Sequence, residues 1–276
     1  MRPASRTLLP AHRIRPEGYA WLSSRPLHVL VFLTPLVLVY QIALIFVLSS
    51  DDGSTVETIR AHGTIARFFE AFRATGLALP GIALMVVLAV WHVLSGDPWR
   101  IRPGTIAGMY GESLAWTPPL LVLALTLASN APHPGAMSPG VWNDAAPVLA
   151  FASGVPGHAQ DWRAAVALSI GAGLYEELLF RLILITALHA VLFDLFKIPQ
   201  GPASATAILG SAVAFALYHD LSSWPSPLIG FLFYALAGAY FGAIFMLRGF
   251  GVVVGVHAAY NTIILLVVYP RLSAGG

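Results

Sequence analysis

Long apolar runs separated by short polar segments dominate the chain. A transmembrane helix needs about 20 predominantly apolar residues. Runs of this kind predict seven spanning helices, at residues 26–48, 79–94, 112–129, 161–193, 203–218, 228–247 and 252–269. The fourth is longer than a bilayer requires, so we expect it to tilt or to project into the cytoplasm. The pattern predicts an all-α, polytopic membrane bundle.

The segment between the first two runs has a different pattern. In residues 50–77 the apolar side chains recur at helical spacing and charged side chains fill the other positions. This predicts an amphipathic helix that lies on the outer surface or caps the bundle. A helix packed in a loop without lipid contact is an equally good interpretation.

Three regions follow from these runs. Residues 1–25 form a basic cytoplasmic tail, and residues 26–160 hold the N-terminal spans with their external loops. Residues 130–160 are rich in Pro, Gly and Ala and predict an external loop, with a short re-entrant piece near 147–152. Residues 161–272 form the third region, where the intramembrane polar groups gather.

Composition supports the membrane assignment. Of 276 residues 57% are hydrophobic and 10% are charged, whereas soluble domains average about 25% charged residues. Mean hydropathy is +0.76. The absence of cysteine excludes disulfides, thiolate nucleophiles and cysteine-bound metals. The net charge of +2 is spread over short loops, so we predict no nucleic-acid partner.

The distribution of basic residues predicts the orientation. With the N-terminus inside, nine Arg and Lys face the cytoplasm and five face outward. This asymmetry agrees with the positive-inside rule. Lys occurs once against fourteen Arg, which favours a GC-rich genome and thus the cytoplasmic membrane of a bacterium.

Three ionisable residues interrupt the fourth run: Glu176, Glu177 and Arg181. Such groups at membrane depth are costly, so they face one another or a watery cavity. Glu177 and Arg181 are four residues apart and share a helix face. We therefore expect them to pair, while Glu176 faces the cavity as a general base.

Two other spans carry polar pairs with the same spacing. Phe215 and His219 lie four apart in FALYH, and His257 and Asn261 lie four apart in HAAYN. One Glu and two His can activate a water, and Asn with the second His can donate to an oxyanion. A structural role is the alternative for each pair taken alone. We assign purely structural roles to the remaining intramembrane histidines, His28, His92 and His189.

EELLFR at 176–181, FALYH at 215–219 and HAAYN at 257–261 together resemble a known family. Read as EExxxR, FxxxH and HxxxN, they are similar to the CAAX protease and bacteriocin-processing (CPBP, Abi) family. Its members are intramembrane proteases related to the Rce1-type prenyl endopeptidase. The resemblance covers about the last 110 residues.

The resemblance implies hydrolysis of a peptide bond inside the membrane. It makes Glu176 the general base with His219, and His257 with Asn261 the pair that stabilises the oxyanion. Glu177, Arg181 and Phe215 become supporting residues. A metal is undecided; if one is used, the candidate is zinc held by Glu176, His219 and His257.

The substrate implied is a peptide or protein that enters from the bilayer. The sequence does not say whether it is prenylated, nor does it give the pathway, the oligomeric state or the metal dependence. Two other functions stay open. One is a non-catalytic membrane scaffold or bacteriocin-immunity protein with the same fold. The other is a proton-coupled transporter, which the lack of an internal repeat disfavours.

Overall fold

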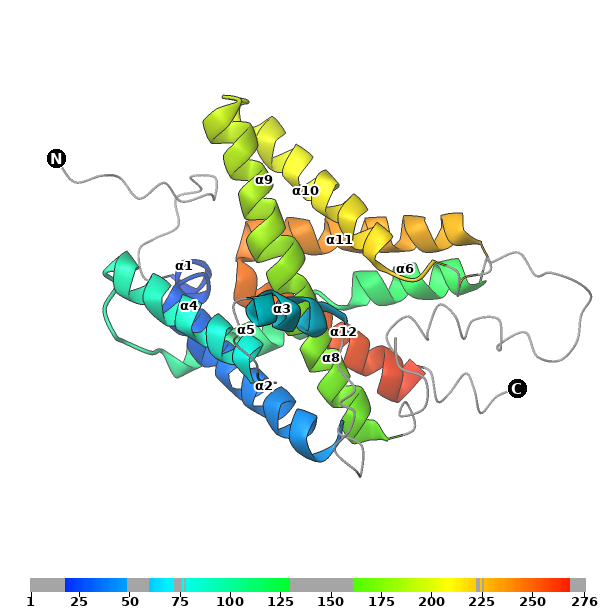
Figure 1. Cartoon of the computed structure of the whole chain (residues 1–276), viewed down its shortest axis with the longest axis horizontal. Coiled ribbons are helices and arrows are strands. Elements are labelled where there is room, and N and C mark those ends of the chain that lie inside the picture. Colours follow the sequence, from blue (N-terminus) through cyan, green and yellow to red (C-terminus); the bar gives the residue numbers. More distant parts are fainter. Residues whose placement is uncertain are drawn as a thin grey trace, which may run out of the picture.

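The computed structural model describes residues 18–48, 60–71, 76, 78–129, 161–221, 224 and 226–268. Within these ranges every regular element is helical (Figure 1). Most of the predicted tail at 1–25 and all of the predicted external loop at 130–160 lie outside the described residues. The division into three regions stays a prediction.

The helices are numbered in chain order, and π-helical segments are labelled η. Their bounds are α1 (Tyr19–Ser23), α2 (Pro26–Phe46), α3 (Arg60–Ala71), α4 (Leu79–Ser95), α5 (Pro103–Ala115), α6 (Pro118–Ser129), α8 (Trp162–Glu177), η1 (Leu178–Ile185), α9 (Thr186–Ala190), η2 (Val191–Leu195), α10 (Gln200–Tyr218), α11 (Pro227–Arg248), α12 (Phe250–Ile263) and η3 (Ile264–Val268).

Five helical stretches in the described residues are long and apolar enough to cross a bilayer. They are α2, the continuous rod from α8 to η2, α10, α11, and α12 with η3. Helix α4 is apolar but shorter, at 17 residues. Large apolar side chains are exposed on these helices, including Phe46 at 78% and Leu94 at 79%. In a bilayer the lipid-facing side chains are apolar and the polar groups are buried inside the bundle. The prediction of an all-α membrane bundle is therefore confirmed.

The third predicted span is wrong as a single helix. Helix α5 has 13 residues and α6 has 12, and the chain breaks between them at Trp116 and Thr117. Pro118 and Pro119 cause the break, because proline lacks an N–H and disfavours helical geometry in the residue before it. Residues 103–111, which lie between the second and third predicted spans, are also helical, as part of α5.

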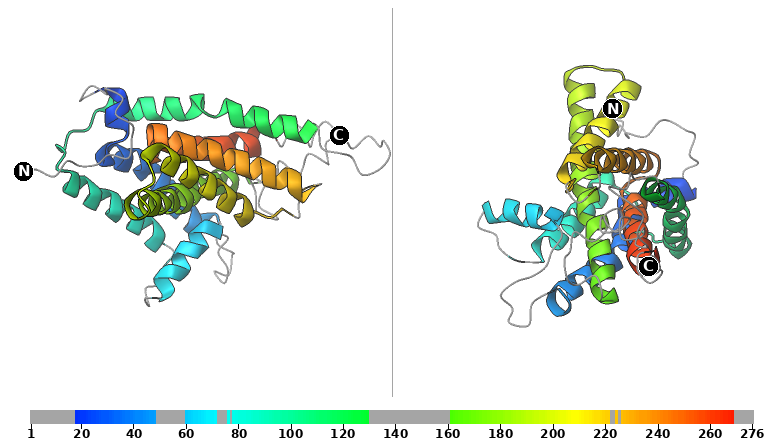
Figure 2. Two further views of the ribbon diagram at one scale, coloured as in Figure 1. Left: turned by 90° about the horizontal axis from the view of Figure 1, so that it is seen from above. Right: turned by 90° about the vertical axis from the view of Figure 1, so that its right-hand side faces the viewer.

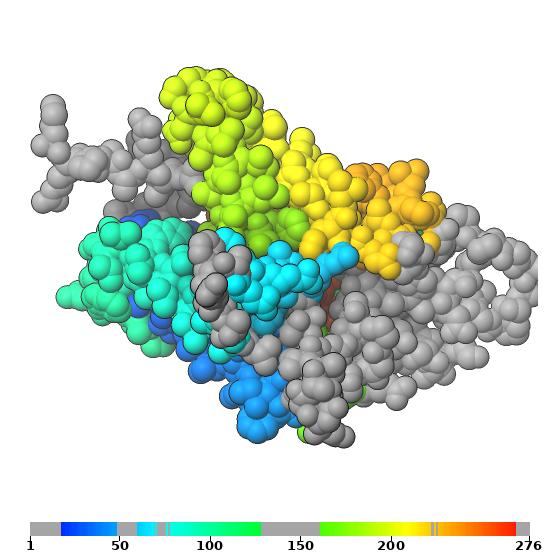
Figure 3. Space-filling model, viewed as in Figure 1, coloured from blue at the N-terminus to red at the C-terminus, as the bar shows by residue number. Residues whose placement is uncertain are grey.

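The predicted amphipathic helix is confirmed as α3, which packs against α4 and α8. It lies on the face of the molecule that Figure 3 shows. The buried His62 ring meets Tyr40 and Tyr175 edge-on, with centroids 5.6 and 5.0 Å away. Arg60 donates to the carbonyl of Tyr218 at the end of α10. Helix α3 therefore caps the bundle close to the end of the FALYH segment.

The rod from α8 to η2 is the axis of the fold. Its 34 residues, at about 1.5 Å each, exceed the roughly 30 Å hydrocarbon core. In the right-hand view of Figure 2 the η2 end of the rod and the adjoining start of α10 project together beyond the other helices. The expectation of a projecting fourth span agrees with this shape. The rod changes from α- to π-helix immediately after Glu177.

Glycines allow the closest helix crossings. A Cβ on Gly173 would stand 2.8 Å from the Val254 oxygen and 2.9 Å from the Ala258 nitrogen, both backbone atoms of α12. A Cβ on Gly238 would stand 3.0 Å from the Ala212 Cα of α10. Small residues therefore set the spacing of α8 from α12 and of α11 from α10.

Gly173→Ala should destabilise the bundle by about 1–3 kcal/mol, because a backbone neighbour cannot rotate away from the new methyl group. Reversible unfolding in detergent measures the loss. Gly111→Ala is the matched control, since a Cβ there meets nothing within 4 Å. Equal stability of the two variants would show that α8 and α12 are not in this close contact.

A polar cluster joins α1, α5 and the end of α11. The Glu112 carboxylate accepts from Tyr19 Oη at 2.6 Å, from Arg248 Nη2 at 2.8 Å and from Trp116 Nε1 at 3.2 Å. Burial acts to raise the pKa of Glu112, but the bonds from Arg248 and Tyr19 outweigh it, so the pKa is lowered.

The lowered pKa predicts the sign of an acid effect. The stabilisation from Glu112 is complete above its unfolded pKa and is lost as the pH falls through its lower folded pKa. Glu112→Gln should therefore flatten the fall in melting temperature between neutral pH and about pH 3. Melting curves of both proteins across this range test the effect, and parallel curves would contradict it.

Candidate functional site

The motif residues come from three helical regions. Glu176 and Glu177 end α8, and Arg181 follows in η1. His219 directly follows α10, while His257 lies on α12. All of these side chains are buried except His219, whose side chain is 13% exposed. Residues distant in the chain thus meet inside the bundle.

Glu177 is the centre of a buried polar chain. Its Oε1 atom accepts from Arg181 Nη1 at 3.0 Å and from His257 Nδ1 at 2.6 Å. Both Glu177 and Arg181 are 0% exposed. Arg181 Nη2 also donates to the Gly238 carbonyl at 3.2 Å. The expected Glu177–Arg181 pair is present, and sequence reasoning missed that the same carboxylate orients His257.

His219 is held by the residue four positions before it. Its Nδ1 atom lies 2.7 Å from the Phe215 carbonyl oxygen, which can only accept, so Nδ1 carries the proton. The Phe215 ring is fully buried and its centroid lies 4.4 Å from the guanidinium carbon of Arg181. Phe215 therefore contacts both His219 and Arg181.

Glu176 faces the two imidazoles. Its Oε2 atom lies 3.7 Å from His219 Nε2 and 3.9 Å from His257 Nε2. Because each Nδ1 atom donates elsewhere, each neutral ring presents an unprotonated Nε2. When both rings are neutral, the two Nε2 atoms and the Glu176 carboxylate are all hydrogen-bond acceptors, and no donor lies between them. A water molecule placed there would supply the missing donors.

Asn261 shares the face of α12 that carries His257, one turn farther along. It is 3% exposed, and its Oδ1 atom is buried without a hydrogen-bond partner among the described residues. No hydrogen bond of the described residues joins it to Glu176, His219 or His257. The structure thus brings together three of the four predicted catalytic residues, and Asn261 lies near them through its helix.

The donor types suit zinc, because each imidazole donates its second N–H to an oxygen, as zinc-binding histidines do. The spacing is less suitable. Ligands about 2.1 Å from a tetrahedral zinc lie roughly 3.4 Å apart, and both separations here are longer. Among the described residues no group of three His, Asp or Glu is arranged to hold a metal ion. No step is therefore assigned to a metal.

Helix α11 supplies contacts that the motifs do not contain. Tyr234 stacks on His219, and Phe241 stacks on His257. The spacing of seven residues places Tyr234 and Phe241 on one helix face and is visible in the sequence. Aromatic residues at this spacing usually pack in the core, so the spacing alone does not indicate a site. The π-helical register of η1 was also missed, since nothing in an apolar run distinguishes it from α-helix.

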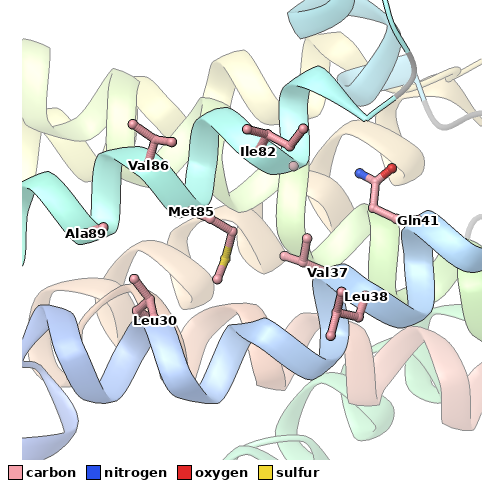
Figure 4. A pocket seen from close by; sticks show the side chains of 9 residues that line it. Leu30, Val37, Leu38, Gln41, Ile82, Met85, Val86 and Ala89 are labelled. Carbon is pink, nitrogen blue, oxygen red and sulfur yellow. The ribbon is translucent and has the colours of Figure 1, made fainter.

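An apolar groove of about 450 Å³ lies between α2 and α4 (Figure 4). Its lining includes Leu30, Val37 and Met85, with Gln41 as the polar member. Gln41 Nε2 donates to Tyr175 Oη at 3.3 Å. None of the motif residues lines this groove.

Comparison with known proteins gives one match. A family model described as type II CAAX prenyl endopeptidase Rce1-like matches residues 158–263, a span that contains every motif residue. No curated protein and no solved structure matches the chain. The family match confirms the resemblance inferred from the three motifs.

Proposed function

We propose that this integral membrane protein is an intramembrane endopeptidase that uses a water activated by Glu176, because residues 158–263 match the model of Rce1-like type II CAAX prenyl endopeptidases. The observation that carries the proposal is the position of Glu176 Oε2, which lies 3.7 Å from His219 Nε2 and 3.9 Å from His257 Nε2. A water between Glu176 Oε2 and the neutral Nε2 of His219 can donate one proton to each of them and keep a lone pair for attack.

The reaction follows from this arrangement. Glu176 takes a proton from the water while the water oxygen forms a bond to the peptide carbonyl carbon. The π electrons of the carbonyl move onto the carbonyl oxygen. His219 holds the second water proton and orients the nucleophile. The tetrahedral intermediate then collapses, the C–N bond breaks, and Glu176 returns the proton to the leaving nitrogen.

Stabilisation of the oxyanion falls to α12. The Asn261 amide can donate in any protonation state. His257 can donate from Nε2 only as imidazolium, protonated before the water attacks, because its Nδ1 proton is directed toward Glu177. The Glu177 carboxylate, 2.6 Å away, would stabilise that charged form. Glu177 and Arg181 support this arrangement by holding His257.

The substrate is proposed to be a peptide or protein segment that reaches the site from the bilayer. The family name denotes prenylated substrates, whereas a bacterial source would favour unmodified ones. We propose a bacterial cytoplasmic membrane with the N-terminus inside. Protease protection of N- and C-terminal tags on inverted vesicles tests the orientation, and a protected N-terminal tag would contradict it.

The test of the function is a cleavage assay with purified protein in liposomes. A library of membrane-associated peptides, with and without a prenylated cysteine, is incubated with wild type and with Glu176→Ala. Cleavage by wild type alone supports the proposal. Metal analysis of the same preparation decides between a glutamate and a metallo mechanism. A scaffold would leave all peptides intact and would keep its cellular phenotype in Glu176→Ala.

A further inference from the structure

Helix α11 carries no acid, imidazole or amide of the proposed site, yet it touches both histidines. The Tyr234 and His219 rings are stacked, with centroids 4.0 Å apart and planes at 21°. The Phe241 and His257 rings are stacked as well, at 4.5 Å and 15°. Seven residues are close to two helical turns, so one face of α11 presents both aromatic rings.

His219 needs such a support because its helix has already ended. Its φ of −84° and ψ of 156° are extended, so α10 does not fix its direction. The bond from Nδ1 to the Phe215 carbonyl holds that nitrogen, and the Phe215 and Tyr218 rings meet the imidazole edge-on. The nearly parallel face of Tyr234, which is 3% exposed, is the contact that restrains a tilt of the imidazole plane.

His257 is restrained in the same manner. A single hydrogen bond of 2.6 Å joins its Nδ1 atom to Glu177, and the buried Phe241 ring covers one imidazole face. Rotation of the imidazole about the bond would carry Nε2 away from Glu176. The nearly parallel aromatic face resists this rotation because the two planes would clash.

The backbone of α11 is fixed between the two aromatic residues. The Gly238 carbonyl accepts from Arg181 Nη2 at 3.2 Å. The missing side chain of Gly238 lets α11 approach α10, since a Cβ there would lie 3.0 Å from Ala212 Cα. The stacking distances therefore depend on a helix that is anchored to both neighbouring motif segments.

We infer that α11 is the platform that sets the planes of both imidazoles, with Tyr234 and Phe241 as positioning residues of the site. The effect on cleavage rests on the proposed function, whereas the restraint of the rings does not. The Tyr234 hydroxyl has no part in this role, which the aromatic face alone performs.

The kinetic test compares three variants on a peptide that wild type cleaves. Tyr234→Leu should lower kcat by about 10- to 100-fold with KM unchanged, because a misplaced nucleophile affects only the reacting geometry. Tyr234→Phe should keep the wild-type kcat. Phe233→Leu is the matched control: Phe233 is 0% exposed on the same helix, and it meets Trp224 at a tilt and Tyr234 edge-on and stacks on no imidazole.

A second measurement does not depend on activity. Diethyl pyrocarbonate modification of His219, quantified by mass spectrometry, should be faster in Tyr234→Leu than in wild type, Tyr234→Phe or Phe233→Leu. If wild type cleaves nothing but this difference appears, the proposed function fails and the platform stands. Equal kcat and equal modification in Tyr234→Leu and Phe233→Leu overturn the platform, whatever the fate of the function.

Discussion

Glu176→Gln should lower the rate of peptide cleavage by about 10²- to 10⁴-fold, the usual contribution of a positioned general base. The amide has nearly the same shape as the carboxylate but cannot take a proton from water. Its Oε2 position faces Nε2 of both histidines, and an amide there can itself donate to the neutral Nε2 of His219. The variant thus removes the base and competes with the water.

The melting temperature of Glu176→Gln and a control variant show whether the lost cleavage comes from misfolding. The melting temperature of Glu176→Gln should stay near that of wild type, because the side chain keeps its volume. Glu70→Gln, on the exposed surface of α3, should keep full activity. Unchanged cleavage by Glu176→Gln would remove Glu176 from the mechanism and would favour a scaffold role.

Arg181→Met should destabilise the protein by about 3–5 kcal/mol, the typical result of leaving one partner of a buried ion pair alone. Glu177 and Arg181 are both 0% exposed, and the bond between them is 3.0 Å long. The substitution also removes the guanidinium from its contacts with the Phe215 ring and the Gly238 carbonyl. Equilibrium unfolding in detergent measures the change.

The double variant Glu177→Leu/Arg181→Met distinguishes charge burial from orientation. It removes both charges, so most of the lost stability should return. Activity should stay low, because His257 Nδ1 no longer has the carboxylate that accepts from it at 2.6 Å. A double variant with wild-type cleavage would show that Glu177 serves stability alone.

The sequence predicts the membrane bundle and most of the site for a common physical reason. Ionised groups in an apolar run are expensive, so Glu176, Glu177 and Arg181 were expected to face one another or a watery cavity. The four-residue spacing gave the Glu177–Arg181 pair directly. His219 and His257, on two other spans, were expected at the same site because the three motifs together resembled one family.

The rest depends on geometry that local sequence does not encode. Two consecutive prolines break α5 from α6, but an apolar run of spanning length concealed the break. The bond from His257 to Glu177 depends on how closely α8 and α12 approach at Gly173. The stacking of Tyr234 on His219 requires the mutual placement of α10 and α11. Each is a tertiary contact, set by packing between segments far apart in the chain.

The most direct test of the account is a double-mutant cycle on the cleavage rate, with Glu176→Gln, His219→Ala and the two combined. If both side chains act on one water, the double variant should lose no more activity than the more damaged single variant, as groups that work as a unit do. Losses that multiply in the double variant would show that Glu176 and His219 act independently, and would contradict a shared water between them.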